Sequence, residues 1–262
     1  MRIGFYQFSP RFGRPQDNLA SLRRALETCR ADLVVLPELA TSGYLFRSRE
    51  EVARAAEPVD GRCVRELVHL AREHDCHLVA GLPEAAGGRF YNSAVLVSPR
   101  GLQGCYRKVH LFNEEKRFFS PGENLKALYE INGVKVGLLV CFDHMFPEAA
   151  RTLVLAGAQL VCHPSCLVLP EYGQLTTRVR ALENRIFWVL ANRQGSEDRG
   201  GVKLVYTGCS QVVAPSGEIL AQAGAEEDVL KVVEIAPTLA DDKRVTPAND
   251  LFADRRPALY GS

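Results

Sequence analysis

Three residues that could carry out covalent chemistry are each expected at or near the end of an apolar strand. Glu38 ends the predicted strand "DLVVLPE", Lys108 lies within "CYRKVHLF", and Cys141 ends "VGLLVC". A thiolate is a nucleophile, a carboxylate can accept and return a proton, and an ammonium can stabilise a developing oxyanion. Because the carboxyl ends of strands gather at one side of an α/β fold, these distant residues could share one site.

Taken alone, each of the three residues has an ordinary structural explanation. A cysteine at a strand end is most often a buried, inert thiol. A glutamate after a proline is usually a solvated loop charge, and a lysine next to Arg107 is usually a surface charge. The residues that flank all three therefore decide whether a common site is expected.

The flanking segments closely resemble the nitrilase, or carbon–nitrogen hydrolase, superfamily. The resemblance covers nearly the whole chain, and the order and spacing of Glu, Lys and Cys fit it. It implies a catalytic triad of Glu38, Lys108 and Cys141, with Glu115 rather than its neighbour Glu114 as a second contributing glutamate. The segments that carry it are "LVVLPELATSGY", "YRKVHLFNEEKRFFSPGE", "VGLLVCFDHMFPEAARTLVLAGAQLVCHPS", "RALENRIFWVLAN" and "GCSQVVAPSGEIL".

The chemistry implied by this resemblance is hydrolysis of a carbon–nitrogen bond through a thioester. Cys141 attacks the substrate carbon while Glu38 acts as general base, and Lys108 and the backbone N–H of Phe142 stabilise the oxyanion. We expect a small linear amide or nitrile as substrate, giving a carboxylic acid and ammonia. The alternatives are an N-carbamoyl amine or amino-acid amidohydrolase, and a non-catalytic interaction module on the same fold. These groups all come from the protein, so no cofactor is expected.

Other reactive residues suggest weaker alternatives. His144, three residues after Cys141, would serve a Cys–His protease, but no protease signature surrounds it. "CHPSC" places His163 between Cys162 and Cys166, yet the second half of a zinc motif is missing, and we predict no metal site. The eight cysteines are scattered through apolar patterns, which favours reduced, buried thiols over a disulfide scaffold.

Aromatic residues around the expected site predict an apolar pocket. Tyr44, Phe142 and Phe146 are the predicted substrate contacts. Arg178 and Arg180 could bind a substrate carboxylate or pair with structural acids such as Glu183, and the sequence does not decide between them. Further candidates for the pocket lining are Phe112, Phe118, Phe119, Met145, Leu167 and Tyr172.

The order of predicted elements favours one α/β domain over residues 1–262, because short apolar strands alternate with amphipathic helices. The resemblance implies a four-layer αββα sandwich that pairs into a homodimer or a higher homo-oligomer, with the tail 245–262 at a subunit interface. Strands are predicted at 1–8, 32–38, 76–86, 90–101, 104–112, 132–143, 159–165 and 186–195, and 206–220 and 228–236 are predicted to form a sheet edge. Helices are predicted at 15–31, 50–58, 61–75, 146–158 and 176–185.

Charge and composition argue against several classes of partner. The net charge of +1 and the 47% hydrophobic content are ordinary for a soluble globular protein, so neither nucleic acid nor a membrane surface is an expected partner. No apolar run is long enough to span a bilayer, and the first residues are typical of a strand rather than a signal peptide. We therefore expect a cytoplasmic protein.

Overall fold

The structure is a computed structural model that describes residues 1–28 and 30–260. One of the eight cysteines, Cys29, and the last two residues of the tail lie outside the described residues.

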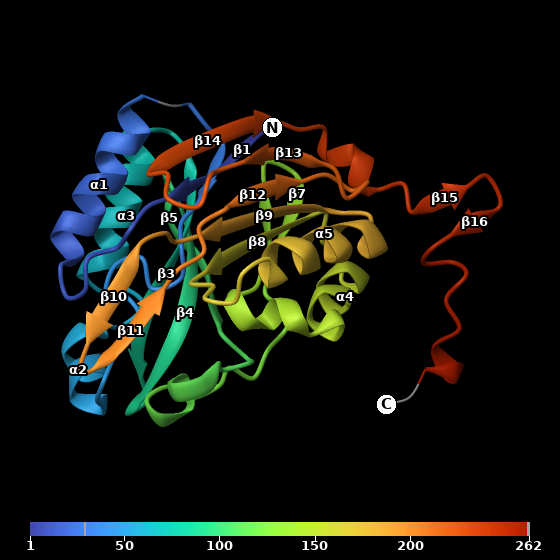
Figure 1. Cartoon of the computed structure of the whole chain (residues 1–262). Helices are drawn as coiled ribbons and strands as arrows, with labels where there is room; N and C mark the ends of the chain where they lie inside the picture. Colours follow the sequence, from blue (N-terminus) through green and yellow to red (C-terminus); the bar gives the residue numbers. More distant parts are fainter. Residues whose placement is uncertain (29, 261–262) are drawn as a thin grey trace.

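Two six-stranded sheets form the centre of the molecule (Figure 1). The first has the order β14-β1-β2-β3-β4-β5, and the second has the order β13-β12-β9-β8-β7-β6. Three adjacent strands run parallel in each sheet, β1 to β3 in the first and β7 to β9 in the second. The strands beside them pair antiparallel. The first sheet comprises β1 (Arg2–Gln7), β2 (Leu33–Val35), β3 (His77–Ala86), β4 (Arg89–Ser98), β5 (Gly101–Arg107) and β14 (Val229–Glu234). The second comprises β6 (Leu128–Ile131), β7 (Val134–Leu138), β8 (Leu160–Ser165), β9 (Phe187–Asn192), β12 (Gln211–Val213) and β13 (Ile219–Gln222).

Helices cover the outer face of each sheet. Leu78 and Ala80 of β3 join the apolar faces of α1 (Pro15–Glu27) and α3 (Arg62–Glu73), whereas Val79 between them faces the second sheet. This alternation is what a strand covered on both sides requires. Helices α4 (Pro147–Leu155) and α5 (Tyr172–Asn184) cover the second sheet, and α2 (Arg49–Ala55) lies beside β3. The predicted four-layer αββα sandwich is confirmed (Figure 1).

Several predicted elements differ in the structure. The segments 206–220 and 228–236 do not share one edge, because β13 and β14 are edge strands of different sheets. The strand β6 and the hairpin of β10 (Ser196–Arg199) and β11 (Val202–Val205) were not predicted. After β14 the chain forms a small pair, β15 (Arg244–Thr246) and β16 (Asn249–Asp250), and the tail projects beyond α4 and α5 (Figure 1).

No helix in residues 1–28 and 30–260 has both the length and the apolar composition needed to cross a bilayer. The longest of them, α1 and α5, have 13 residues each.

Candidate active site

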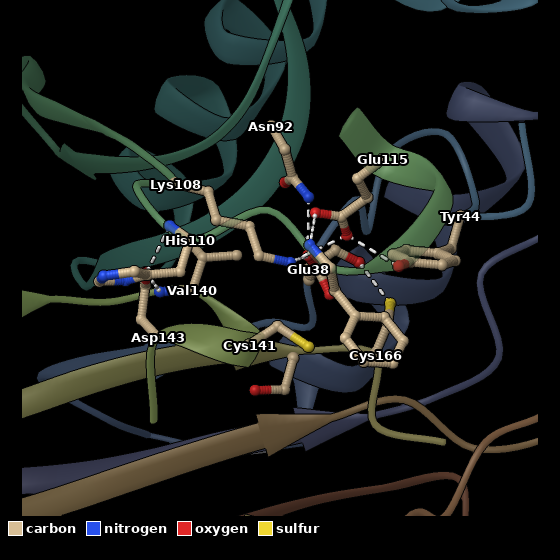
Figure 2. Close-up of polar contacts among 12 residues, drawn as sticks. Glu38, Tyr44, Asn92, Lys108, His110, Glu115, Val140, Cys141, Asp143 and Cys166 are labelled. Atoms are coloured by element: carbon tan, nitrogen blue, oxygen red, sulfur yellow. Dashed lines mark hydrogen bonds and ion pairs between the residues drawn. The ribbon is translucent and has the colours of Figure 1, made fainter. Parts of the chain in front are cut away.

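The three residues predicted as a triad come together between the sheets, each just beyond a strand. Strand β2 ends at Val35, β5 at Arg107 and β7 at Leu138, so Glu38, Lys108 and Cys141 follow their strands by one to three residues. The expectation that Glu38 and Cys141 are the last strand residues was therefore wrong. The short turns after the strands aim the three side chains toward one point (Figure 2).

A buried ammonium lies between two carboxylates. Lys108 Nζ donates to Glu38 Oε1 at 2.7 Å and to Glu115 Oε1 at 2.8 Å, and the Lys108 side chain is fully buried (Figure 2). Burial lowers the pKa of Lys108, but the Glu115 and Glu38 charges outweigh burial and hold that pKa well above its usual value. Lys108 is therefore charged, and because an ammonium has three N–H donors, one is left to meet a substrate.

One carboxylate oxygen of Glu38 accepts hydrogen bonds, and the other accepts none from the described residues. Oε1 accepts from Lys108 and, at 2.6 Å, from the amide of Asn92 on β4. Oε2 is buried and has no hydrogen-bond partner among residues 1–28 and 30–260. An unpaired carboxylate oxygen in a buried site is costly unless a ligand uses it. Glu38 Oε2 is thus available to take a proton from the thiol or from a substrate.

The geometry separates Glu115 from Glu114. Glu115 is 5% exposed, and its Oε1 accepts from Tyr44 Oη at 2.7 Å as well as from Lys108. Its Oε2 accepts from the backbone N–H of Phe112 at 3.0 Å, and burial raises the pKa of this carboxyl. Glu114 is exposed and pairs with Arg117 on the surface. The position of Glu115 fits the second glutamate implied by the family resemblance.

Cys141 sits on a sharp turn that its neighbours stabilise. It begins the short 3₁₀ helix Cys141–Met145 with a φ of +44°, a conformation that costs a non-glycine residue on the order of 1–3 kcal/mol. The Asp143 carboxylate accepts from the Val140 N–H at 2.9 Å and from Tyr106 Oη at 2.7 Å. These contacts position the turn, which points the thiol at the charged cluster instead of into the core.

Two histidines complete the support of this turn. Asp143 Oδ1 accepts from the His110 N–H at 3.1 Å and lies 2.7 Å from His110 Nδ1. His163 Nε2 lies 2.8 Å from the carbonyl oxygen of Cys141, and burial lowers the pKa of His163 to about 4. Since His163 is therefore neutral near pH 7, its Nε2–H donates to that carbonyl. No hydrogen bond among the described residues uses the Phe142 N–H, which stays available as an oxyanion donor.

The resting thiol is protonated at neutral pH. Burial is the main cause that raises the pKa of Cys141 well above its usual value, and the Glu38 charge raises it further. The Lys108 ammonium lowers this pKa but does not compensate. The thiol is 5% exposed. Attack on a substrate therefore requires that a nearby base remove the proton during the reaction.

A small cavity opens onto the thiol, and a larger one adjoins it. The first, about 70 Å³, is lined by Cys141, Phe112, Phe142, His144, Met145, Cys166, Leu167, Val168, Leu169 and Tyr172. The second, about 260 Å³, is bordered by Tyr44, Phe118 and Phe119 among others, and Phe112 and Val168 border both. Most of the aromatic residues predicted for the pocket therefore lie around one two-part cleft.

One predicted substrate contact, Phe146, and the two arginines whose role the sequence left open make other contacts in the structure. Phe146 lines neither cavity: its ring stacks on His110 with centroids 3.7 Å apart and supports the edge of Phe142. Arg178 Nε donates to the Gly217 carbonyl at 3.1 Å, and Arg180 pairs with Glu183 at 3.0 Å. We therefore assign Phe146 to support of Phe142, and both arginines to structural contacts rather than to a substrate carboxylate.

The alternative arrangements around the histidines have no matching geometry. His144 Nδ1 lies 2.6 Å from Thr176 Oγ1, and burial lowers the pKa of His144 to about 3, so it is a poor base. His163 contacts the carbonyl of Cys141 rather than its thiol, and Cys166 Sγ donates to the Glu38 carbonyl at 3.2 Å. In the described part of the chain no group of three His, Cys, Asp or Glu side chains could hold a metal ion.

The burial of His163 predicts a stability change with pH. Its pKa of about 4 lies below the ordinary 6.5, so between these values the unfolded chain binds more protons and stability falls as the pH is lowered. The loss at pH 4 is about 3 kcal/mol. Urea unfolding at pH 7 and pH 4 is expected to show a smaller difference in His163→Asn than in the parent. The exposed His69→Asn serves as control, and an unchanged difference in His163→Asn would contradict this assignment.

The residues that hold Glu38, Lys108 and Cys141 in place were not predicted from the sequence. Asn92 is a buried amide just before the apolar run 94–97 of β4, and Asp143 lies two residues after Cys141. A buried polar residue inside an apolar segment is a signal that could have found Asn92. The roles of Tyr106 and His110 depend on contacts with Asp143 that no sequence pattern encodes.

Comparison with known proteins agrees with the family resemblance read from the sequence. The carbon-nitrogen hydrolase family profile matches residues 2–244. The chain is 40% identical to a nitrilase from Pyrococcus abyssi over 99% of each chain, and 38% identical to an (R)-stereoselective amidase from a Pseudomonas species over 100% of this chain and 93% of that one. A solved variant of the amidase from Nesterenkonia sp. AN1, which shows the Michael addition of acrylamide at the active-site cysteine, is 33% identical with a TM-score of 0.77 and coverage of 93% and 96%.

Proposed function

The chain belongs to the carbon-nitrogen hydrolase family, and on that premise we propose that it cleaves a small linear amide or nitrile to a carboxylic acid and ammonia through a thioester on Cys141. The single observation that carries the proposal is the free Glu38 Oε2 in a buried site that also holds the Lys108 ammonium and the Cys141 thiol. Together these groups supply a base, an oxyanion donor and a nucleophile.

For an amide, the reaction begins with formation of a carbon–sulfur bond. Glu38 Oε2 takes the thiol proton while Cys141 Sγ attacks the carbonyl carbon, and the carbonyl electron pair moves to oxygen. The third N–H of Lys108 and the N–H of Phe142 stabilise that oxyanion. A pre-aimed donor of this kind contributes about 3 kcal/mol to transition-state stabilisation.

The second half of the reaction releases both products. The oxyanion collapses, the carbon–nitrogen bond breaks, and Glu38 returns its proton to the departing ammonia. Water then attacks the thioester while Glu38 accepts one of its protons, and cleavage of the carbon–sulfur bond gives the acid and the thiol. Glu115 Oε1 accepts hydrogen bonds from Lys108 and from Tyr44, and in this way it orients both side chains. A nitrile follows the same route with one further water.

The two alternatives fit the site less well. An N-carbamoyl substrate would react by the same steps. The lining of the small cavity at Cys141, however, has no feature that favours the extra nitrogen of such a substrate. A non-catalytic module would have little use for a lysine and two carboxylates buried together, because removing such charges from water costs several kcal/mol. The buried charges therefore favour an enzyme.

A substrate panel tests the proposed function. Ammonia release is measured for linear amides, nitriles and N-carbamoyl compounds, and the acid-to-amide ratio is recorded for any nitrile consumed. We expect turnover of amides or nitriles above turnover of carbamoyl compounds. Preference for the carbamoyl compounds would establish the alternative, an N-carbamoyl amidohydrolase. Absence of turnover throughout would overturn the proposal.

We also propose that the protein is a homodimer or a higher homo-oligomer that associates through α5. Four apolar residues on the exposed side of this helix are 41–61% exposed: Tyr172, Leu175, Val179 and Leu182. Their spacing places them along one stripe, and such a stripe on a soluble protein marks an interface. The tail after β14 projects past the same layer, which suits contact with a second subunit (Figure 1).

Charges placed in this stripe are expected to separate the subunits. Light scattering after gel filtration should give the parent at least twice the 28.9 kDa chain mass, and the double variant Leu175→Glu, Val179→Glu the mass of one chain. Leu102→Glu, at another exposed leucine on β5, should keep the parental mass. A monomeric parent at micromolar concentration would overturn the assembly.

A further inference from the structure

The cleft beside Cys141 has two parts that differ in size and in neighbours. The inner cavity of about 70 Å³ touches the thiol, and the outer one of about 260 Å³ borders Tyr44 and Glu115. Phe112 and Val168 line both cavities, so the two cavities adjoin at these side chains. The inner part is large enough only for the reacting end of a substrate, which leaves the outer part for a substituent.

The wall of the outer cavity comes partly from the β10–β11 hairpin. Val202 and Leu204 line the cavity and are half-buried, while Lys203 and Val205 alternate with them and are exposed. This is the two-residue period of a strand whose one face is covered. The hairpin therefore presents an apolar face to the cavity, whose lining also includes the aromatic side chains of Phe118 and Phe119.

The hairpin is held firmly against the loop that carries Tyr44. The Glu197 carboxylate accepts from the backbone N–H of Tyr44 at 3.1 Å and of Leu45 at 2.6 Å, and pairs with the buried Arg193 at 2.6 Å. Arg199 donates to the Leu45 carbonyl at 2.9 Å. Fixed in this way, the wall is preorganised and its side chains can discriminate between substrates of different shape.

Charge at the cavity is sparse. Arg47, Glu114 and Glu115 are the charged residues of its lining, and both glutamates already have partners, Glu114 in Arg117 and Glu115 in Lys108. Most of the remaining lining is aliphatic or aromatic. A ligand that fills this space gains from burial of carbon rather than from charge pairing.

We propose that the outer cavity binds an apolar substituent of the substrate, an unbranched aliphatic chain or a phenyl ring, and that Val202 and Leu204 set its permitted size. The inference rests on the proposed function, since it names the class of amide that the Cys141 site accepts. It makes both residues determinants of specificity with no part in the chemical steps.

The test compares a series of unbranched amides from acetamide to hexanamide. In the parent, kcat/KM should rise about fourfold for each added methylene that reaches the outer cavity. Leu204→Trp and Val202→Phe should lower kcat/KM for hexanamide at least tenfold and leave acetamide within twofold. Lys203→Trp places the same bulk on the exposed face of the same strand and should leave the whole series unchanged.

Binding measurements separate failure of this inference from failure of the proposed function. Calorimetric titration of Cys141→Ala with acetamide and hexanamide should show tighter binding of hexanamide, and Leu204→Trp in that background should remove the difference. This result would support the cavity assignment even if no amide were hydrolysed. A kcat/KM flat with chain length, together with equal binding of both amides, would overturn it.

One further comparison tests the apolar character itself. Glutaramate differs from pentanamide by a carboxylate in place of the terminal methyl group, and Arg47 lies at the outer cavity. We expect pentanamide to have the higher kcat/KM. Preference for glutaramate that disappears in Arg47→Ala would show that charge governs this cavity, and would overturn the apolar assignment.

Discussion

Replacing Cys141 with alanine is expected to lower kcat/KM for every hydrolysed substrate by about 10⁴-fold or more. The thiol is the group that forms the covalent bond, and the alanine leaves Glu38, Lys108 and their contacts in place. Because the substitution removes a single sulfur atom beside an existing cavity, the variant should fold. Ammonia release and urea unfolding, measured together, check both statements.

A matched control is available in the same sheet. Cys162 is a fully buried thiol on β8 that does not line the cleft, so Cys162→Ala removes the same atoms without touching the site. We expect this variant to lose stability and to keep most of its turnover. Hydrolysis by Cys141→Ala at a rate similar to Cys162→Ala would be incompatible with covalent catalysis by Cys141.

Changing Glu38 to glutamine is expected to lower kcat by about 10²–10⁴-fold. The amide has the shape of the carboxylate, and its oxygen can keep the contacts from Asn92 and Lys108 that Oε1 makes now. What it lacks is the ability to accept a proton at the position of Oε2. Glu130→Gln, at an exposed glutamate of β6 that lines neither cavity, is the control and should retain parental kcat.

The Glu38 variant also has a readout that does not depend on turnover. Burial and the two carboxylates raise the pKa of Cys141, so the thiol is a poor nucleophile without a base. Alkylation by iodoacetamide at pH 7, followed at the Cys141 peptide by mass spectrometry, should be slower in Glu38→Gln than in the parent. Loss of the Glu38 charge lowers the pKa of the thiol, and we expect loss of the proton acceptor to outweigh that effect. An equal or faster rate would mean that Glu38 does not activate the thiol.

The fold was largely predictable because its core strands and helices have clear periodicity. The apolar spacing of Leu19, Leu22 and Leu26 gives α1, and unbroken apolar segments give the central strands. The β10–β11 hairpin was not predictable from periodicity, because "SEDR" has no apolar face and is held by Glu197 and Arg199 contacts to a distant loop. Its Gly200–Gly201 turn, followed by the short segment "VKLV", was an available signal.

The candidate site was predictable in its members but not in its geometry. Flanking motifs identified Glu38, Lys108 and Cys141, whereas the positive φ of Cys141 results from contacts with Asp143 and His163 that only the folded chain creates. Because of such turns, Glu38 and Cys141 lie beyond their strands rather than at the last strand residues. Burial in the folded chain also distinguishes Glu115 from the exposed Glu114, two adjacent glutamates that the sequence alone does not tell apart.

Phe146 illustrates the limit of reading a pocket from residue type. An aromatic residue five positions after Cys141 is a reasonable substrate contact, and a phenylalanine gains as much by stacking inside the protein. The stacking on His110 takes Phe146 out of the cleft and leaves Phe142 at its wall. Which of two nearby rings faces a ligand depends on the turn between them.

A trapped intermediate shows which residue carries the acyl group, and we expect Cys141 to carry it. A nitrophenyl ester of butyric acid should acylate the enzyme faster than water removes the acyl group, so that the thioester accumulates. Acid quenching and peptide mass spectrometry are expected to place one butyryl group on Cys141 in the parent and on no residue of the cleft in Cys141→Ala. A butyryl group on Cys166, or a burst of nitrophenol with Cys141 unmodified, would rule out Cys141 as the nucleophile.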